Sequence, residues 1–324
     1  MTRTMRRSLT TVLTVAALAT GLGFAVGAKA GDTIVVGKAV PFAWTFTPTD
    51  VGIELGIWKK HGFDEVKIVG FGGDAKMQQG LIAKNVDFGL GSGPAMAFAA
   101  KGGAGMPVAA FATGPRNLTL AVKYDSKLSK PSEFKGKKLG VTTAGSLTDW
   151  LTRRLSQTQG WGTEGVTPVA LGGLEGSLRA VETGQVDGLV IAAAVSYVLE
   201  EKKTLKPIYN FGDLVKDFHT HVIFGRRDLI ESKPDLVQRF VNGWFDTVKY
   251  MAANKAKTVE ITSRVLKQPP HIISRVYDSE MQMLTHNGKF DPKAVAVLKQ
   301  SYVEMGLLDK QPKDEEIFTT RFVK

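Results

Sequence analysis

The stretch Val86-Asp87-Phe88-Gly89-Leu90-Gly91-Ser92-Gly93-Pro94 has a counterpart 100 positions further along the chain, at Val186-Asp187-Gly188-Leu189-Val190. The same shift of 100 places the pair Gly72-Gly73 on the pair Gly172-Gly173. A match that extends this far predicts that a whole structural unit is duplicated within the chain.

The first copy of this unit has the pattern of a βαβ motif. A strand at 66–69 leads through a Gly-Gly turn into an amphipathic helix at 75–84, and a second strand follows at 87–90. Such units stack into open parallel sheets, which bind ligands outside the carboxyl ends of their strands. Gly91-Ser92-Gly93 is expected at such an end, either beside a ligand or simply as a tight turn. Two similar α/β lobes that face one another would create a cleft.

The amino-terminal segment has the order of a cleavable export signal. Arg3, Arg6 and Arg7 precede an uncharged apolar run at 9–26, which ends in Ala28-Lys29-Ala30. We expect cleavage near Ala30 rather than a membrane anchor, because glycines and threonines interrupt the run and no stop-transfer charges follow. The pair Arg6-Arg7 leaves both general secretory and twin-arginine export open.

Composition indicates an exported globular protein. The 324 residues are 43% hydrophobic and include no cysteine, which excludes disulfides, thiolate nucleophiles, Cys-ligated metals and a lipid-modified cysteine. With no later apolar run of spanning length, we expect a free periplasmic protein. Loss of the four basic residues of the signal lowers the formal charge from +11 to +7. This favours small anionic ligands or a membrane surface, whereas the scattered basic pairs do not indicate nucleic acid.

The loop that follows the predicted strand at 33–39 combines aromatic and hydroxyl side chains. Its members are Phe42, Trp44, Phe46, Thr45 and Thr47. One interpretation is that the aromatic rings contact an apolar or planar part of a ligand. The other is that Phe42 and Phe46 face the core while Trp44 covers the loop.

Arg116 lies where the chain is expected to leave the first lobe, between strands at 108–112 and 118–123. Extended backbone at this crossing is a natural hinge. A guanidinium there is suited to carboxylate or sulfonate oxygens in the cleft, and the alternative is a surface arginine on a turn.

In the second lobe a strand at 139–141 is followed by a turn at 142–146 and a helix at 147–159. Ser146 or Thr148 is a suitable N-cap, and the free amides and positive dipole end of this helix form a potential anion site. Capping alone is the simpler interpretation. The duplicated strand ends in the small residues of 192–196, which leave room for a ligand or for close helix packing.

The last third of the chain begins with a strand at 219–226 that returns to the first lobe. His219 and His221 fall on one face of this strand, but no third metal ligand is apparent, so solvent-facing or hydrogen-bonded histidines are expected. We therefore predict no metal and no cofactor. Helices are expected at 234–253, 255–266, 270–288 with a break, and 292–305.

Four ordered motifs carry a resemblance to a known family. They are Gly52-x-x-x-Gly56-x-x-x-x-x-Gly62-Phe63, Asn85-Val86-Asp87-Phe88-Gly89, Phe134-x-Gly136-Lys137-Lys138-Leu139-Gly140-Val141 and Gly184-Gln185-Val186-Asp187-Gly188. Together they resemble the periplasmic substrate-binding proteins for nitrate, sulfonate and taurine, a group that includes relatives similar to the thiamine-pyrimidine synthesis protein. The resemblance covers nearly all of the chain after the signal.

The resemblance implies a type II periplasmic binding protein fold, in which two lobes of mostly parallel sheet flanked by helices enclose a ligand cleft. It implies lobe 1 from 31–118 and 220–324, lobe 2 from 119–219, and a monomer that delivers its solute to the permease of an ABC importer. By position it implies a binding set of Phe42, Trp44, Thr45, Phe46, Ser92, Gly93, Arg116, Thr143, Gly145, Ser146, Ala193 and Val195. The second Val-Asp strand lacks the proline or acidic residue that often follows it in relatives, which leaves the ligand's identity open.

Our prediction is a small organic anion, such as a sulfonate, a taurine-like compound or a carboxylate, held by Arg116, helix N-termini and hydroxyls. One alternative is a neutral heterocycle such as a thiamine-precursor pyrimidine, stacked on Trp44 and Phe46. An enzyme is the other alternative, but the sequence contains no serine nucleophile elbow and no apparent His-carboxylate constellation.

Overall fold

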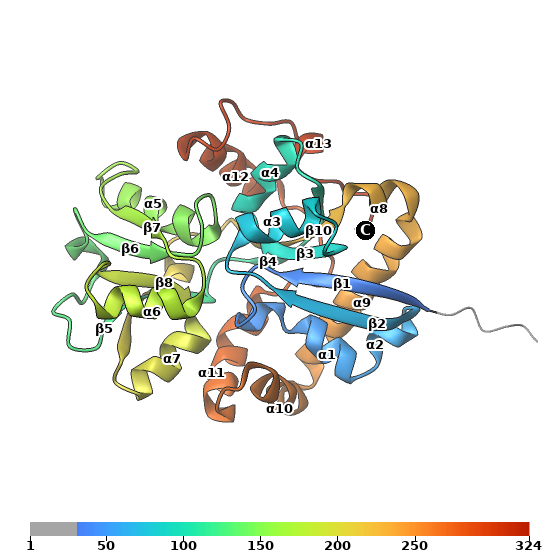
Figure 1. The fold of residues 1–324 in the computed structure, drawn as a ribbon, viewed down its shortest axis with the longest axis horizontal. Coiled ribbons are helices and arrows are strands. Elements are labelled where there is room, and N and C mark those ends of the chain that lie inside the picture. The colour runs from blue at the N-terminus through green and yellow to red at the C-terminus, as the bar shows by residue number, and fades with distance from the viewer. Residues whose placement is uncertain (1–30, 324) are drawn as a thin grey trace, which may run out of the picture. The chain divides into compact units, whose positions relative to one another are not determined.

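The computed structural model describes residues 31–323, so the predicted export signal at 1–30 lies outside the described residues. The described part contains two five-stranded sheets with helices packed around them (Figure 1). Within it, no helix has the length and apolar character needed to cross a membrane.

The first sheet has the strand order β2-β1-β3-β10-β4. Its strands are β1 (Asp32–Lys38), β2 (Phe63–Gly70), β3 (Phe88–Ser92), β4 (Gly105–Thr113) and β10 (His219–Arg226). β1 pairs in parallel with β2 and β3, whereas β10 is antiparallel to both β3 and β4. The carboxyl ends of β1 and β3 therefore lie at the same edge of the sheet.

The second sheet repeats this arrangement in the order β7-β6-β8-β5-β9. Its strands are β5 (Leu118–Lys123), β6 (Lys138–Val141), β7 (Thr167–Ala170), β8 (Gly188–Ala192) and β9 (Leu205–Asn210). Here β5 is the antiparallel strand, paired with β8 and β9. Each sheet is thus mostly parallel, as expected, with one antiparallel strand contributed where the chain crosses between sheets.

The helices occupy much of the length that the hydrophobic periodicity predicts. They are α1 (Pro48–Glu54), α2 (Ile57–Lys60), α3 (Asp74–Ile82), α4 (Ala97–Ala100), α5 (Leu147–Thr158), α6 (Leu174–Glu182), α7 (Ala193–Glu201), α8 (Arg227–Ser232), α9 (Pro234–Ala253), α10 (Lys255–Leu266), α11 (Pro270–Glu280), α12 (Pro292–Glu304) and α13 (Asp314–Ile317). The helical segment after β1 is divided into α1 and α2, because Gly56 between them adopts a left-handed φ of 64°. Only glycine takes this conformation without strain.

The predicted duplication is visible in helices and strands that repeat at a constant spacing of 100 residues. Helices α3 and α6 begin and end 100 residues apart, at Asp74 and Leu174 and at Ile82 and Glu182. Strands β3 and β8 are offset by the same 100 residues. Because equivalent elements end at equivalent points, the two copies present the same positions to the region between the sheets.

Helix α9 anchors the carboxyl-terminal helices to the first sheet through aromatic packing. Phe240 stacks on Phe88 of β3 with ring centroids 3.9 Å apart, and on Trp58 of α2 at 5.1 Å. Burial of such side chains contributes about 1.5 to 3 kcal/mol each. This aromatic packing fixes α9 and α2 against the first sheet.

The predicted boundaries of the lobes, 31–118 with 220–324 and 119–219, stay a prediction. The chain passes from the first sheet to the second between β4 and β5 and returns between β9 and β10. However, the chain from Gly31 onward forms one compact unit. Helix α11 also packs against α7, beside the second sheet (Figure 1).

Glu280, the last residue of α11, is an unusual buried acid. Its side chain is 1% exposed, and Oε2 has no hydrogen-bond partner among the described residues. Burial raises the pKa of this carboxyl from 4.5 to about 8. The group therefore remains protonated at neutral pH in the folded protein.

We expect Glu280→Gln to change how stability depends on pH. Between about pH 4.5 and 8 the unfolded carboxyl is ionised while the folded one keeps its proton. Folding must then take up a proton, so the stability of the unsubstituted protein falls as pH rises through this window, by at most about 1.4 kcal/mol per pH unit. Urea unfolding from pH 4 to 9 should show the variant gaining relative stability up to about pH 8 and then holding level. If the unfolding free energies of the two proteins stayed a constant distance apart from pH 4 to 9, the raised pKa of Glu280 would be contradicted.

Candidate functional site

A cleft lies at the carboxyl ends of the parallel strands, where the two sheets approach one another. It consists of two adjoining pockets of about 400 and 370 Å³ of empty space, part of which is open to solvent. Both pockets take residues from both sheets or the loops that follow them. Those that line both pockets are Val40, Leu118, Thr142, Thr148 and Ala192. The enclosed part that a water-sized sphere can reach is about 40 and 30 Å³, so a larger solute requires the walls to move apart.

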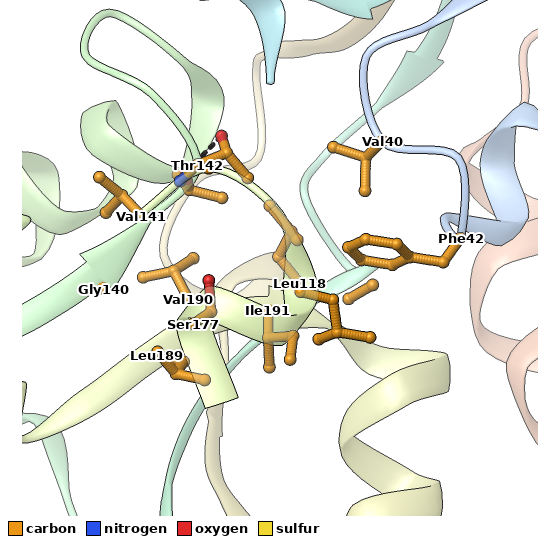
Figure 2. Close-up of a pocket in the computed structure, with 14 residues that line it drawn as sticks. Val40, Phe42, Leu118, Gly140, Val141, Thr142, Ser177, Leu189, Val190 and Ile191 are labelled. Atoms are coloured by element: carbon orange, nitrogen blue, oxygen red, sulfur yellow. Dashed lines mark hydrogen bonds between the residues drawn. The ribbon is translucent and has the colours of Figure 1, made fainter. Parts of the chain in front are cut away.

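The larger of the two, which we call the apolar pocket, is lined almost wholly by hydrocarbon. Figure 2 shows Val40 and Phe42, from the loop after β1, facing Leu118, Val190 and Ile191 of the second sheet. Leu174, at the start of α6, completes this wall. The pocket is therefore suited to the apolar body of a ligand.

The smaller one, which we call the polar pocket, contains a buried acid. Asp74, the first residue of α3, accepts hydrogen bonds from the backbone amide and the hydroxyl of Ser92, at 2.9 and 2.8 Å. Ser92 ends β3, so a strand end and a helix start meet here. Burial raises the pKa of Asp74, and the hydrogen bonds from Ser92 and from the Leu147 amide only partly offset this shift.

Asn117 and His221 form the neutral part of the polar pocket. The Asn117 amide nitrogen lies 2.8 Å from Nε2 of His221 and 3.4 Å from the hydroxyl of Thr45. If Nε2 accepts this bond, the proton of the neutral ring resides on Nδ1. Burial lowers the pKa of His221 to about 3, so the imidazole is uncharged at physiological pH. The carbonyl oxygen of Asn117 has no partner among the described residues.

Three hydroxyls of the second sheet's turn complete the polar side and bond to one another. Ser146, Thr142 and Thr148 lie 2.9 to 3.1 Å apart. Ser146 caps α5 by accepting from the Asp149 amide, and Asp149 in turn accepts from the Gly145 amide at 2.8 Å. The chain's own groups thus already partner the amides of the predicted anion site.

The two Gly-Gly turns of the duplicated units meet across the cleft. A Cβ placed on Gly72 would lie 3.2 Å from the Gly173 amide nitrogen and 3.4 Å from the Gly172 carbonyl carbon. A side chain at Gly72 would therefore press on the opposite turn, whereas one on Gly173 would meet nothing within 4 Å.

Only some of the residues expected at the site line the two pockets. Phe42 lines the apolar pocket, and Phe46 and Ser92 line the polar pocket. Thr45 and Ser146 lie behind the lining, bonded to Asn117 and to Thr148.

The other predicted residues lie outside the lining. Ala193 and Val195 are buried in α7, and Gly145 and Thr143 occupy the turn before α5, Thr143 packing against Gly73. Gly93 packs so tightly that a Cβ would lie 2.0 Å from the His219 carbonyl oxygen.

Trp44 and Arg116 are placed differently from the expectation that they face a ligand. Trp44 is a core residue, 1% exposed, whose indole N–H lies 3.2 Å from the hydroxyl of Thr262. Arg116 is exposed and lines a separate surface pocket with Gly212 and Lys216.

The lining residues that the sequence-based set missed include Asp74, Asn117 and His221. His221 attracts attention in the sequence only as one of a histidine pair, and no group of three metal-binding side chains is found among residues 31–323. Asp74 could have been found from the duplication, because the first copy carries an acid at a position where the second copy carries Leu174.

Solved structures similar to this chain are periplasmic binding proteins and their relatives. The alkanesulfonate-binding protein SsuA from Xanthomonas axonopodis pv. citri, bound to MOPS, matches with a TM-score of 0.74 and 15% identity over 88% of this chain and 96% of that one. The nitrate-binding protein NrtA from Synechocystis PCC 6803 matches with a TM-score of 0.68 and 14% identity over 88% and 83%. A mutant of DszB in complex with biphenyl-2-sulfinic acid matches with a TM-score of 0.62 and 16% identity, over 90% of this chain and 97% of that one.

The fold is therefore the two-lobed fold of periplasmic binding proteins. The family model described as NMT1/THI5 like matches residues 44–258, which is more than half of the chain, and the protein belongs to this family. A search of curated proteins gives no match.

We expect stability measurements to separate Trp44 from Arg116. Trp44→Ala should lower the unfolding free energy by about 3 to 5 kcal/mol, because it leaves a cavity in the core. Arg116→Ala should change it by less than about 0.5 kcal/mol, because the side chain is exposed. Urea denaturation followed by fluorescence measures both. A large loss in Arg116→Ala would show a structural role that its contacts do not indicate.

Proposed function

We propose that this protein is the solute-binding component of an ABC importer, which captures one small organic solute in the cleft and delivers it to a membrane permease. The observation that carries the proposal is a cleft with walls from both sheets, so that one bound molecule touches both. A ligand with such contacts stabilises the closed arrangement over an open one. Membership of the family and the fold of periplasmic binding proteins support the proposal, and so does the predicted export signal.

The lining bears on the charge of the solute. No lysine or arginine lines either pocket among the described residues, and Arg116 is exposed elsewhere. An anion in the polar pocket would meet no positive side chain, and it would repel Asp74 in its ionised form. The organic anion that we expected from the sequence is therefore weakly supported, and an uncharged or cationic solute is favoured.

A binding role is better supported by the geometry than a catalytic one. The polar pocket does bring together Ser92, His221 and Asp74, the residue types of a hydrolytic triad. However, the Ser92 hydroxyl donates to Asp74 instead of His221, so the nucleophile lacks a hydrogen-bonded base. The low pKa of His221, about 3, also makes it a weak base. Turnover of a solute by the isolated protein would revive the catalytic alternative.

We expect a thermal-shift screen to identify the solute class. The panel comprises sulfonates, nitrate, carboxylates, pyrimidines and amines, with calorimetry on each compound that raises the melting temperature. A solute at about 100 times its dissociation constant should stabilise the fold by about 2.7 kcal/mol. Hits that disappear when Leu118→Trp fills the shared wall of both pockets would place the solute in the cleft. A hit that this variant leaves unchanged would place it elsewhere.

We also expect Gly72 to limit how closely the two turns approach. Gly72→Ala should weaken binding of any hit modestly, and Gly72→Val more strongly, because added atoms press on Gly172 and Gly173. Gly173→Ala is the matched control, since its Cβ meets no atom within 4 Å. Calorimetry gives the affinities, and small-angle scattering with ligand should show a larger radius of gyration for Gly72→Val. Equal affinities in all three variants would contradict a closing role for this contact.

A further inference from the structure

The cleft is asymmetric at positions that the duplication makes equivalent. Asp74 and Leu174 are both the first residue of their helix and lie 100 positions apart, yet one lines the polar pocket and the other the apolar pocket. Likewise Ser92 ends β3 where Ala192 ends β8. At both pairs of equivalent positions the first copy carries a polar side chain and the second carries hydrocarbon.

Asp74 faces the cleft without a basic partner. It is the one acidic side chain among the described residues that line either pocket, and no lysine or arginine lines them. Lys76 lies near the facing Gly-Gly turns, and its side chain is exposed. Its Nζ lies 3.4 Å from the point where a Cβ on Gly172 would be. The hydrogen bonds that Asp74 accepts come from uncharged groups. Burial without a cation disfavours the ionised form of Asp74, and a cation brought by a ligand would stabilise that form, so binding of the cation is coupled to release of the Asp74 proton.

A second acceptor in the same pocket points to the same ligand chemistry. The Asn117 side chain is 2% exposed, and its carbonyl oxygen has no partner among the described residues, although its amide nitrogen does. An unpaired buried acceptor lowers affinity for any ligand that cannot donate to it. The ligand therefore needs N–H donors for both Asn117 and Asp74.

We propose that the cleft takes an amphiphilic organic cation, with an ammonium or amidinium group at Asp74 and Asn117 and a small apolar body against Phe42, Leu118 and Leu174. The inference rests on the proposed solute-binding function and specifies its substrate class. An amidinium fits particularly well, because two parallel N–H groups can pair with one carboxylate.

The test compares benzamidine, benzamide and benzoate, which share a ring and differ in charge. A second pair, butylamine and butanesulfonate, repeats the comparison on an aliphatic body. Calorimetry and thermal shift on the unmodified protein should show benzamidine or butylamine binding at least about tenfold more tightly than its uncharged or anionic counterpart. Because this comparison needs no variant, it does not depend on how a substitution affects folding.

Asp74→Asn then identifies the group responsible. The amide keeps the shape but removes the charge, so affinity for the cationic probe should fall at least about thirtyfold. Glu280→Gln is the matched control, a buried acid changed to its amide outside the cleft, and it should leave affinity unchanged. Unchanged binding of the cation in Asp74→Asn overturns the assignment.

The remaining outcomes separate this inference from the function on which it rests. If anions or neutral heterocycles of the wider panel bind in the cleft and the amines do not, the substrate class is wrong while the solute-binding function holds. If no member of either panel binds, both the substrate class and the proposed function fail.

Discussion

The hydrogen bond between Asn117 and His221 ties together the two places where the chain crosses between sheets. Asn117 directly precedes β5 and His221 lies in β10, so the 2.8 Å contact joins both crossing strands at the floor of the cleft. Asn117 also accepts from the Ala193 amide through its backbone oxygen, which fixes the start of α7. Because the bond is buried, a partner that lost it would be left unsatisfied at a cost of about 1 to 3 kcal/mol. The geometry of the pocket thus depends on a buried hydrogen bond between two neutral side chains.

Duplication explains how such a cleft arises, and divergence between the copies explains what it can recognise. Two units with the same element register bring equivalent strand ends and helix starts to one place, and the loop after β1 adds Val40 and Phe42. Small residues at these ends, such as Ser92, Ala192 and the four glycines of the facing turns, let the backbones approach. Recognition then depends on the cleft-lining positions at which the copies differ, such as Asp74 and Leu174.

Much of the fold follows from the sequence because hydrophobic periodicity, glycines and prolines mark its elements. Strand β10 and helices α9 and α10 have the bounds that their patterns predict. The site is less predictable, since it depends on the direction of single side chains. Successive residues in extended chain point to opposite sides, so a step of one residue decides that Asn117 enters the cleft while Arg116 faces solvent. Trp44 differs from Phe42 for a similar reason, because the short helical turn at Trp44–Phe46 rotates the indole into the core.

The buried acid also indicates how the cleft would discriminate among solutes. Hydrocarbon walls favour any apolar body of suitable size, and one methylene more or less changes affinity only modestly. An uncompensated carboxylate acts differently, because a solute that brings another negative charge adds repulsion, and one without N–H donors leaves Asp74 and Asn117 unsatisfied. Selection would then come mainly from the penalties imposed on unsuitable solutes. For such a penalty to operate, Asp74 must stay shielded from water, and its side chain is only 5% exposed.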